Sequence, residues 1–176
     1  MSVEQVLQTG RPLSAYLNGT ADYSDVGHRS NVHLSMVVAA AFFERATRLI
    51  SSADPSNATD PQFLQRIATV ESIINNFNTA LARGASAPSA HYSGTERCIS
   101  ATARSLGQVA LVQLHNMLAE SDVAHPRVRQ RSGECCVRAA RSVVSIVRQV
   151  GEREIDMLDP VIGVRFFPYP LSQLNL

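Results

Sequence analysis

Residues 60–84 read DPQFLQRIATVESIINNFNTALARG, and this stretch has the clearest helical pattern in the chain. Asp60 is a preferred residue type for a helix N-cap, and Pro61 suits the first helical position because its missing N–H is not needed there. Gly84 can adopt the left-handed conformation that ends many helices. Between these limits apolar residues recur at helical spacing: Phe63, Ile67, Val70, Ile74, Phe77 and Leu81. The stretch therefore predicts an amphipathic helix with one buried face.

The stretches on either side of this helix show the same spacing. Residues 30–52 begin with the polar pair Ser30-Asn31, which offers a helix cap, and end before Asp54-Pro55. The stripe predicted for this helix is Val32, Met36, Ala39, Ala40, Phe43, Ala46, Thr47 and Ile50. Another helix, from about residue 95 to residue 121, has the stripe Ile99, Ala103, Leu106, Ala110, Leu114 and Met117, widened by Leu111 and Leu118. The wider stripe predicts that this helix is central.

A last helix is predicted from roughly residue 133 to residue 150. A loop around His125-Pro126 separates it from the preceding helix, and Gly151 closes it. Its predicted stripe is Cys136, Ala140, Val143, Val147 and Val150.

The fold class predicted from these segments is all-α. No stretch shows the sustained alternation and β-branched enrichment that strands need. The first 29 residues are weakly patterned and predict one short helix plus loops, while residues 85–93 predict a mobile loop. The sequence therefore predicts an irregular bundle of four to five helices.

The composition limits the kinds of protein that this chain can be. At 176 residues, with 45% hydrophobic and 18% charged residues, it fits one globular domain. All 16 basic residues are arginines, which excludes a lysine Schiff base and a lysine-dependent phosphate-binding loop. The N-terminus lacks the pattern of a secretory signal, and the longest mainly apolar run, residues 36–43, is too short to span a membrane. These features, together with three cysteines that make no disulfide framework, predict a soluble intracellular protein.

Arginines are concentrated near the last predicted helix. Residues 126–150 contain six arginines and one acidic residue, Glu134. Five of these arginines form a candidate polar-contact surface: Arg127, Arg129, Arg131, Arg138 and Arg141. Such a run is usually a solvated helix face with its leading loop, and less often a surface for an acidic partner or nucleic acid. The acidic residues that follow are interpreted as local charge compensation: Glu152, Glu154, Asp156 and Asp159.

The residues to weigh for metal binding are Cys135, Cys136, His115 and His125, since thiolates and imidazoles are zinc ligands. Adjacent residues on a helix point about 100° apart. No second cysteine pair occurs at CxxC spacing, so the pattern argues against a metal site. The sequence therefore predicts no metal ligand and no cofactor-binding residue, and it predicts that Cys136 is a small core residue with Cys135 beside it.

A catalytic cysteine would need a histidine that activates it. His115 can approach Cys135 or Cys136 if the two helices that carry them pack antiparallel, a point that the spacing leaves open. No GxSxG, HExxH or glycine-rich phosphate loop occurs. The sequence predicts no catalytic residue, and a small helical enzyme that uses Cys135 or Cys136 is the least favoured alternative.

Five short segments occur in an order that resembles a known family. They are residues 41–49 (AFFERATRL), Phe63 with residues 73–77 (IINNF), residues 112–116 (VQLHN), residues 135–141 (CCVRAAR) and residues 158–164 (LDPVIGV). Each is a helical stripe with a few polar marks, but their common order over residues 30–164 is more specific. In this order the chain resembles the regulatory domain of fungal transcription factors with a binuclear, six-cysteine zinc cluster.

The resemblance implies a nuclear, all-helical region that modulates transcription. Its partners would be other parts of the full-length factor, coregulator proteins or a small effector, with no enzyme activity and no membrane association. Zinc is expected only in the separate DNA-binding cluster, because three cysteines cannot supply six ligands. The resemblance therefore implies that this chain reaches DNA only through a missing module.

The expected organisation has three parts. Residues 1–29 form a weakly ordered N-terminal segment, residues 30–164 form a partial helical regulatory domain, and residues 165–176 form a divergent, disordered tail. In the family an apolar helix continues after Leu158-Asp159-Pro160, whereas here the sequence turns to Phe166-Phe167-Pro168-Tyr169-Pro170. A fragment of the regulatory domain is therefore expected. The main alternative is a free-standing helical protein-interaction domain whose stripes imitate the family.

Overall fold

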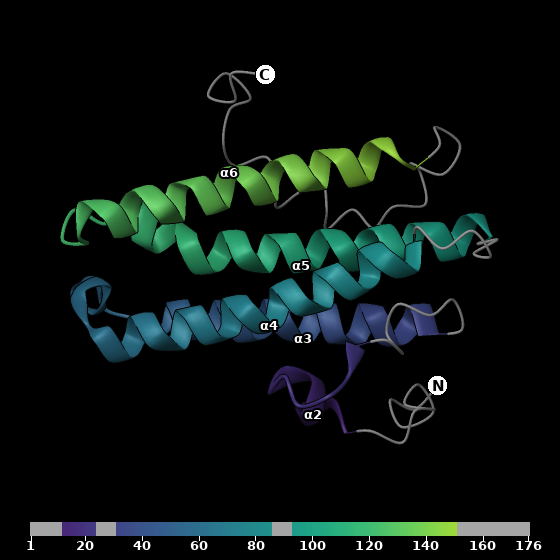
Figure 1. The fold of residues 1–176 in the computed structure, drawn as a ribbon, viewed down its shortest axis with the longest axis horizontal. Helices are drawn as coiled ribbons and strands as arrows, with labels where there is room; N and C mark the ends of the chain where they lie inside the picture. Colours follow the sequence, from purple (N-terminus) through teal and green to yellow (C-terminus); the bar gives the residue numbers. More distant parts are fainter. Residues whose placement is uncertain (1–11, 24–30, 86–92, 151–176) are drawn as a thin grey trace.

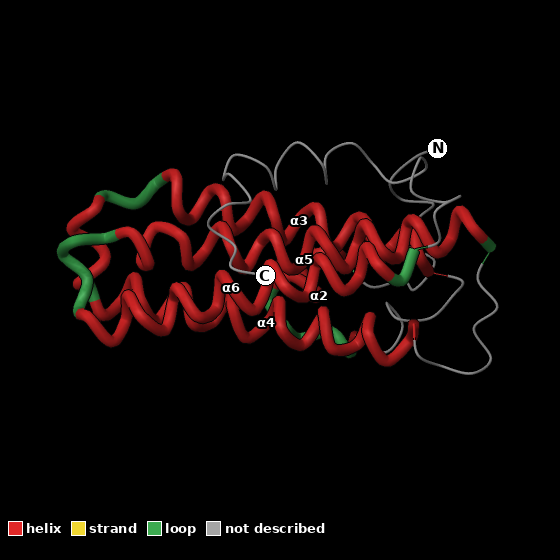
Figure 2. Tube along the Cα trace, turned by 90° about the horizontal axis from the view of Figure 1, so that it is seen from above, coloured by secondary structure: helices red, strands yellow, loops and turns green. Residues whose placement is uncertain are grey.

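The computed structural model describes residues 12–23, 31–85 and 93–150, and the regular secondary structure in these ranges is helical throughout (Figure 2). The helices are α2 (Leu13–Leu17), α3 (Val32–Ser51), the 3₁₀ helix η3 (Pro55–Thr59), α4 (Pro61–Ala85), α5 (Gly94–Glu120) and α6 (Pro126–Arg148) (Figure 1). The prediction of an all-α bundle is confirmed.

The helix α4 begins as predicted and ends later. The backbone N–H of Gln62 donates to Oδ1 of Asp60 at 2.9 Å, and Pro61 is the first helical residue. The prediction that Gly84 ends this helix in the left-handed conformation is wrong, because α4 continues through Gly84 to Ala85. A glycine in the last turn costs a helix only about 1 kcal/mol, so packing of the apolar stripe can carry the helix past it.

Two capping boxes fix the starts of η3 and α5. Before η3, the backbone N–H of Asp54 donates to Oδ1 of Asn57 at 2.6 Å, while the Asp54 carboxylate caps the first turn. Before α5, the N–H of Glu96 donates to Oγ of Ser93 at 3.2 Å, and the N–H of Ser93 donates to Oε2 of Glu96 at 2.7 Å. Each box satisfies backbone donors that a helix start leaves without partners.

The helix α6 begins earlier than predicted. The predicted loop around His125-Pro126 is the helix start itself, so the start near Gly133 is wrong. Pro126 occupies the first helical position, and Nδ1 of His125 accepts a hydrogen bond from the N–H of Arg127 at 3.3 Å. The first arginines of the segment therefore lie on a helix and not in a loop.

The helix α5 occupies the centre of the bundle, as predicted. It packs mainly against α6 and α3, and also against α4. In Figure 1, α6 lies on one side of α5 and α3 and α4 lie on the other, and α5 and α6 run antiparallel. Residues 121–125 make the short connection between these two helices.

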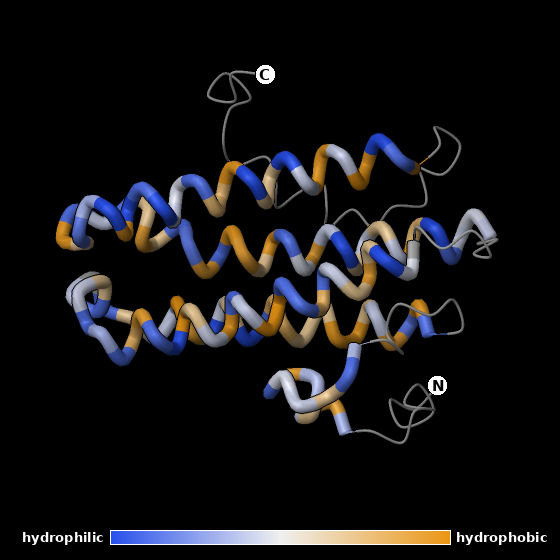
Figure 3. The backbone as a smooth tube through the Cα atoms, viewed as in Figure 1, coloured by the Kyte–Doolittle hydropathy of each residue, from blue (hydrophilic) through white to orange (hydrophobic). Residues whose placement is uncertain are grey.

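The apolar core lies between α3, α4 and α5, with α2 covering one side. Its largest side chains that are completely or almost completely buried are Tyr16, Phe42, Phe77, Leu34, Ile74 and Leu114. The rings of Phe42 and Phe77 meet edge to face with their centroids 5.3 Å apart, a favourable arrangement for aromatic pairs. All six residues of the stripe predicted for residues 60–84 are buried. The colouring in Figure 3 shows such apolar positions recurring along the helices.

On α3, part of the buried face is offset by one residue from the predicted stripe. Phe42 and Leu49 are buried, whereas the predicted Phe43 and Ile50 are only half-buried and Ala40 is exposed. Residues 36–43 are apolar all round the helix, so periodicity alone does not select the face. The edge-to-face contact with Phe77 selects Phe42.

On α6, too, part of the buried face is offset by one residue from the predicted stripe. The buried residues of α6 are Ser132, Cys135, Ala139, Val143 and Ile146, and Val150 is buried just beyond the end of the helix. Val143 and Val150 agree with the prediction, but Cys136, Ala140 and Val147 are half-buried. Valines and alanines continue around this helix, so two neighbouring faces fit the helical spacing equally well.

The short helix α2 lies in the part of residues 1–29 that the structure describes, residues 12–23, where the sequence predicts a short helix. Tyr16 is fully buried, and the hydroxyl of Tyr23 donates a hydrogen bond to the Tyr16 carbonyl oxygen. The guanidinium of Arg45 on α3 donates to the carbonyl oxygen of Leu17. Gly19, at φ 71°, makes the turn after α2 and lies against Ile73 of α4. Such contacts hold a helix that is too short to be stable alone.

Several sequence predictions fall outside the described residues. These are most of the mobile loop predicted at residues 85–93, the closing Gly151, the acidic cluster, the segment 158–164, the tail 165–176 and most of the weakly ordered N-terminus. Within the described ranges, no helix combines the length and the apolar character that crossing a membrane requires.

Candidate functional site

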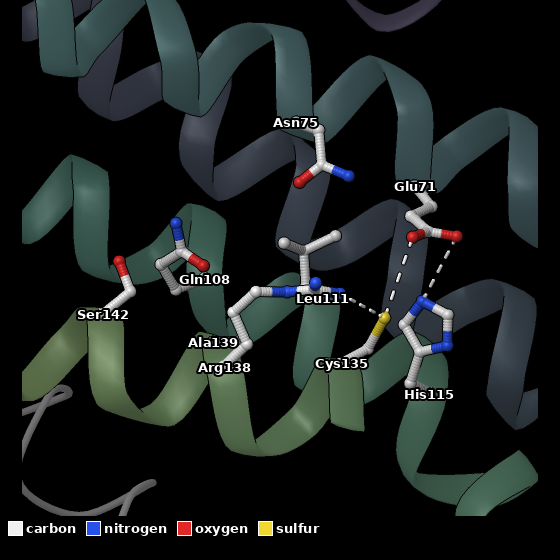
Figure 4. A pocket seen from close by; sticks show the side chains of 9 residues that line it. All are labelled: Glu71, Asn75, Gln108, Leu111, His115, Cys135, Arg138, Ala139 and Ser142. Carbon is white, nitrogen blue, oxygen red and sulfur yellow. Dashed lines mark hydrogen bonds and ion pairs between the residues drawn. The ribbon is translucent and has the colours of Figure 1, made fainter. Parts of the chain in front are cut away.

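A pocket of about 420 Å³ lies between α4, α5 and α6 (Figure 4). Glu71 and Asn75 come from α4, and α5 and α6 supply the other walls. The lining residues are Glu71, Asn75, Gln108, Leu111, His115, Cys135, Arg138, Ala139 and Ser142. Most of them are polar, in contrast to the apolar core on the other side of α4 and α5. We call this site the polar pocket.

Three donor groups converge at one end of the polar pocket. The imidazole Nε2 of His115 lies 3.5 Å from Oε2 of Glu71, and Sγ of Cys135 lies 3.8 Å from Oε1 of the same carboxylate. The thiol, imidazole and carboxylate donor atoms all lie within 4.8 Å of one another. Figure 4 shows both contacts of Glu71 as dashed lines. Each of the three helices thus contributes one group to the cluster.

His115 is held in a buried position with one nitrogen unsatisfied. Its side chain is 4% exposed, and its Nδ1 lies 3.2 Å from Oγ of the buried Ser132 on α6. Nε2 has no hydrogen-bond partner. Burial lowers the pKa of His115, Glu71 counteracts this effect, and Arg131 and Arg138 add to it. The imidazole is therefore neutral at neutral pH, and its contact with Glu71 is not an ion pair.

Two arginines of α6 border the cluster. The guanidinium of Arg138 lies 3.0 Å from Sγ of Cys135, and that of Arg131 lies 3.3 Å from Oε2 of Glu71. The side chain of Arg131 is 69% exposed, whereas that of Glu71 is 13% exposed. An ion pair with one partner so exposed contributes little to stability. The two arginines therefore affect the local charge around the cluster more than the free energy of unfolding.

The two adjacent cysteines have exchanged the roles that the sequence predicts. Cys135 is buried and faces the polar pocket, whereas Cys136 is half-buried and its thiol points to the carbonyl oxygen of Val112 at 3.9 Å. Burial raises the pKa of Cys136 to about 11, so its thiol stays protonated at neutral pH. The third cysteine, Cys98, packs with Ile146 in a separate small cluster.

Of the four residues weighed for metal binding from the sequence, the structure brings together His115 and Cys135. His125 is the exposed N-cap of α6 and Cys136 faces away from the cluster. The antiparallel packing of α5 and α6, which the sequence left open, is what brings His115 near Cys135. Glu71 was missed, because a single acidic residue beside an apolar stripe carries no signal of its partners on other helices.

The candidate arginine surface is divided between different roles. Arg127, Arg129, Arg131, Arg138 and Arg141 are all exposed along α6. Arg131 and Arg138 contact the cluster at the polar pocket, while Arg129 lies 3.9 Å from Asp122 in the connection before α6. The positive face is therefore a rim of the polar pocket as well as a solvated surface.

The donor set limits what the polar pocket can do chemically. A neutral imidazole, a thiol and a carboxylate together can bind a metal ion. For covalent catalysis, the nucleophile would need a hydrogen bond to a base. In the described contacts the thiol of Cys135 meets Glu71 and Arg138, and the imidazole of His115 meets Ser132 and Glu71.

Comparisons of the chain with protein families, with curated proteins and with solved structures found no match.

Proposed function

We propose that this chain is a nuclear, helical regulatory domain of the kind that the sequence resembles, found in fungal transcription factors with a binuclear zinc cluster. It modulates transcription through protein partners or a small effector, and reaches DNA through a separate module. It performs no catalysis of its own. The polar pocket is the effector site in this proposal.

The observation that carries the proposal is where the segments of the resemblance meet. Phe42 and Phe77 belong to two of these segments and form the aromatic contact of the core. Two others supply His115 and Cys135, which meet at the polar pocket. Segments chosen for their order along the chain thus supply both the packing centre and the pocket, which supports a common role for them.

The position of the polar pocket suits regulation. A ligand bound there contacts α4, α5 and α6 together, so it favours the arrangement of α6 that completes the pocket. A ligand shifts a conformational equilibrium only through such differential contacts. Because α6 also carries the exposed arginines, its position would change the surface that a partner protein meets.

A tethering experiment tests the proposal. The chain is fused to an unrelated DNA-binding domain in fungal cells, and a reporter downstream of the matching DNA site is measured. We expect the fusion to change reporter output relative to the DNA-binding domain alone, and Arg138→Ala to reduce that change. Arg141→Ala is the matched control, because Arg141 is an exposed arginine of the same helix that does not line the pocket.

Equal reporter output with and without the chain, at equal protein levels, would contradict a regulatory function. An equal loss in both arginine variants would separate regulation from the polar pocket and assign it to the charged surface of α6.

The second candidate is a free-standing helical protein-interaction domain. The low exposure of apolar side chains favours this candidate. In the described part of the chain, the exposed large hydrophobic residues are Val123 and Val137. A broken domain would expose contiguous apolar helix faces. Cooperative urea unfolding of the purified chain, together with a silent reporter fusion, would support this candidate over the first.

A further inference from the structure

We infer that Glu71, His115 and Cys135 form a binding site for a divalent transition-metal ion with the ligand preferences of zinc. The inference deepens the proposed function and rests on it for the regulatory role of the ion, since the site is the polar pocket. Metal binding itself is a separate property that can be measured without transcription.

The spacing of the donor atoms fits a tetrahedral ion. Zinc bonds of about 2.0–2.3 Å place neighbouring ligand atoms roughly 3.3–3.8 Å apart in a tetrahedron. The imidazole and carboxylate of His115 and Glu71 are 3.5 Å apart, and the thiol and carboxylate of Cys135 and Glu71 are 3.8 Å apart. The third pair of donor atoms, on His115 and Cys135, lies within 4.8 Å, and small side-chain rotations would bring it to the same separation.

The unsatisfied nitrogen of His115 points to the same conclusion. Nε2 is buried without a hydrogen-bond partner, although it lies beside a carboxylate. A buried polar atom without a partner costs about 1–3 kcal/mol. If Nδ1–H donates to Oγ of Ser132, the lone pair of Nε2 faces the carboxylate of Glu71, and an ion between them satisfies both. Hydrogen bonding of the second ring nitrogen is the usual support of a metal-binding histidine.

The charges around the site can adapt to an ion. Binding replaces the thiol proton of Cys135, which leaves to solvent, and the resulting thiolate and the Glu71 carboxylate balance a divalent cation. Arg138 and Arg131 now contact these two groups, and both arginines are exposed, so they can turn to solvent at small cost. The fourth coordination position then opens to the polar pocket, where water or an effector group can occupy it.

Metal titration of the purified, metal-free full-length chain tests the inference. We expect one Zn²⁺ per chain by calorimetry. We also expect Co²⁺ to produce a near-ultraviolet charge-transfer band, which reports a thiolate ligand directly. Cys135→Ser should abolish this band, whereas the matched control Cys136→Ser should retain it, because Cys136 faces Val112.

Two further variants guard against simple misfolding. Glu71→Gln should weaken Zn²⁺ binding by more than the roughly 10- to 100-fold that loss of an outer-shell partner costs, and Ser132→Ala should weaken it about tenfold. Both are checked for an unchanged far-ultraviolet circular dichroism spectrum and urea midpoint. A folded chain that binds neither ion would overturn the inference, and so would a band that is lost in Cys136→Ser but retained in Cys135→Ser.

The same variants separate this inference from the proposed function. A reporter fusion that works equally well with Cys135→Ser, in a chain that binds no metal, rejects the metal site and keeps the regulatory function. One bound ion in a chain whose fusion never changes reporter output keeps the metal site and rejects the regulatory function.

Discussion

The two sides of the bundle are built on opposite principles, although α4 and α5 contribute to both. On the α3 side they bury aromatic and aliphatic side chains, with Phe77 of α4 fully enclosed against Phe42. On the α6 side the same α4 presents Glu71 to an imidazole, a thiol and a guanidinium. Less than two helical turns separate Phe77 from Glu71 along α4.

The difference separates the side of the bundle that should set stability from the side that is proposed to bind a ligand. Burial of apolar area is the main favourable term in folding, so the α3 side should set most of the free energy of unfolding. The polar pocket contains a buried nitrogen without a partner, which costs stability unless a ligand satisfies it. A ligand that satisfied this nitrogen would therefore add to the stability of the α6 side.

Phe77→Ala should produce the largest effect, because it removes a fully buried ring and its contact with Phe42. We expect a loss of about 3–5 kcal/mol in the free energy of unfolding, measured by urea denaturation. Glu71→Gln, on the other face of the same helix, is the comparison and should change it by less than about 1 kcal/mol. Equal losses for the two variants would remove the distinction between the two sides.

Gly107→Ala tests the close contact of α4 and α5 between the two sides. A Cβ at Gly107 would lie 2.1 Å from Oδ1 of Asn78, so the Asn78 side chain would have to move, and we expect a loss of about 1–3 kcal/mol.

In an Asn78→Ala background the obstacle is gone, and the same substitution should stabilise the chain by up to about 1 kcal/mol through helix propensity. A double-mutant cycle measured by thermal denaturation checks this reversal of sign. If Gly107→Ala had the same effect in both backgrounds, the two side chains would not be coupled.

Tyr23→Phe should produce the smallest effect and a change in pH dependence. Loss of the hydrogen bond to the Tyr16 carbonyl should cost about 0.5–1.5 kcal/mol at neutral pH. Burial raises the pKa of Tyr23 from 10.0 to about 12, so the native state keeps a proton that the unfolded chain loses first. The free energy of unfolding should therefore fall as pH rises through this interval.

Urea unfolding at a series of pH values up to about 12 measures this slope, and the part due to Tyr23 should be absent in Tyr23→Phe. If the free energy of unfolding fell equally with pH in the two proteins, the alkaline titration would belong to a group other than Tyr23.

The sequence predicts those parts of the fold whose signals are local. Asp60, Pro61 and one apolar stripe were sufficient for α4, and the capping pattern of Ser93 and Glu96 could have located the start of α5. Where apolar residues surround a helix, local signals fail. The choice between Phe42 and Phe43 depends on Phe77, more than 30 residues away, and the choice between Cys135 and Cys136 depends on α4 and α5.

The candidate site was only half predictable for the same reason. His115 and Cys135 could be weighed because their residue types are chemically distinctive and their helices are neighbours in sequence. Glu71 joins them from a third helix, 64 residues before Cys135, and Ser132 becomes a partner of His115 only through the register of α6. No spacing along the sequence encodes these two contacts.

The small residues of α5 have a consequence for the evolution of this chain. Ala101, Ala103, Ser105, Gly107 and Ala110 are all buried in the helix that three others surround. A larger side chain at any of these positions meets a close-packed neighbour, so accepted substitutions should be rarest there. Exposed arginines of α6 outside the polar pocket, such as Arg127 and Arg141, should vary more by comparison. Distant relatives of this protein should therefore be recognisable by the spacing of small residues along α5 before they are recognisable by their surface charges.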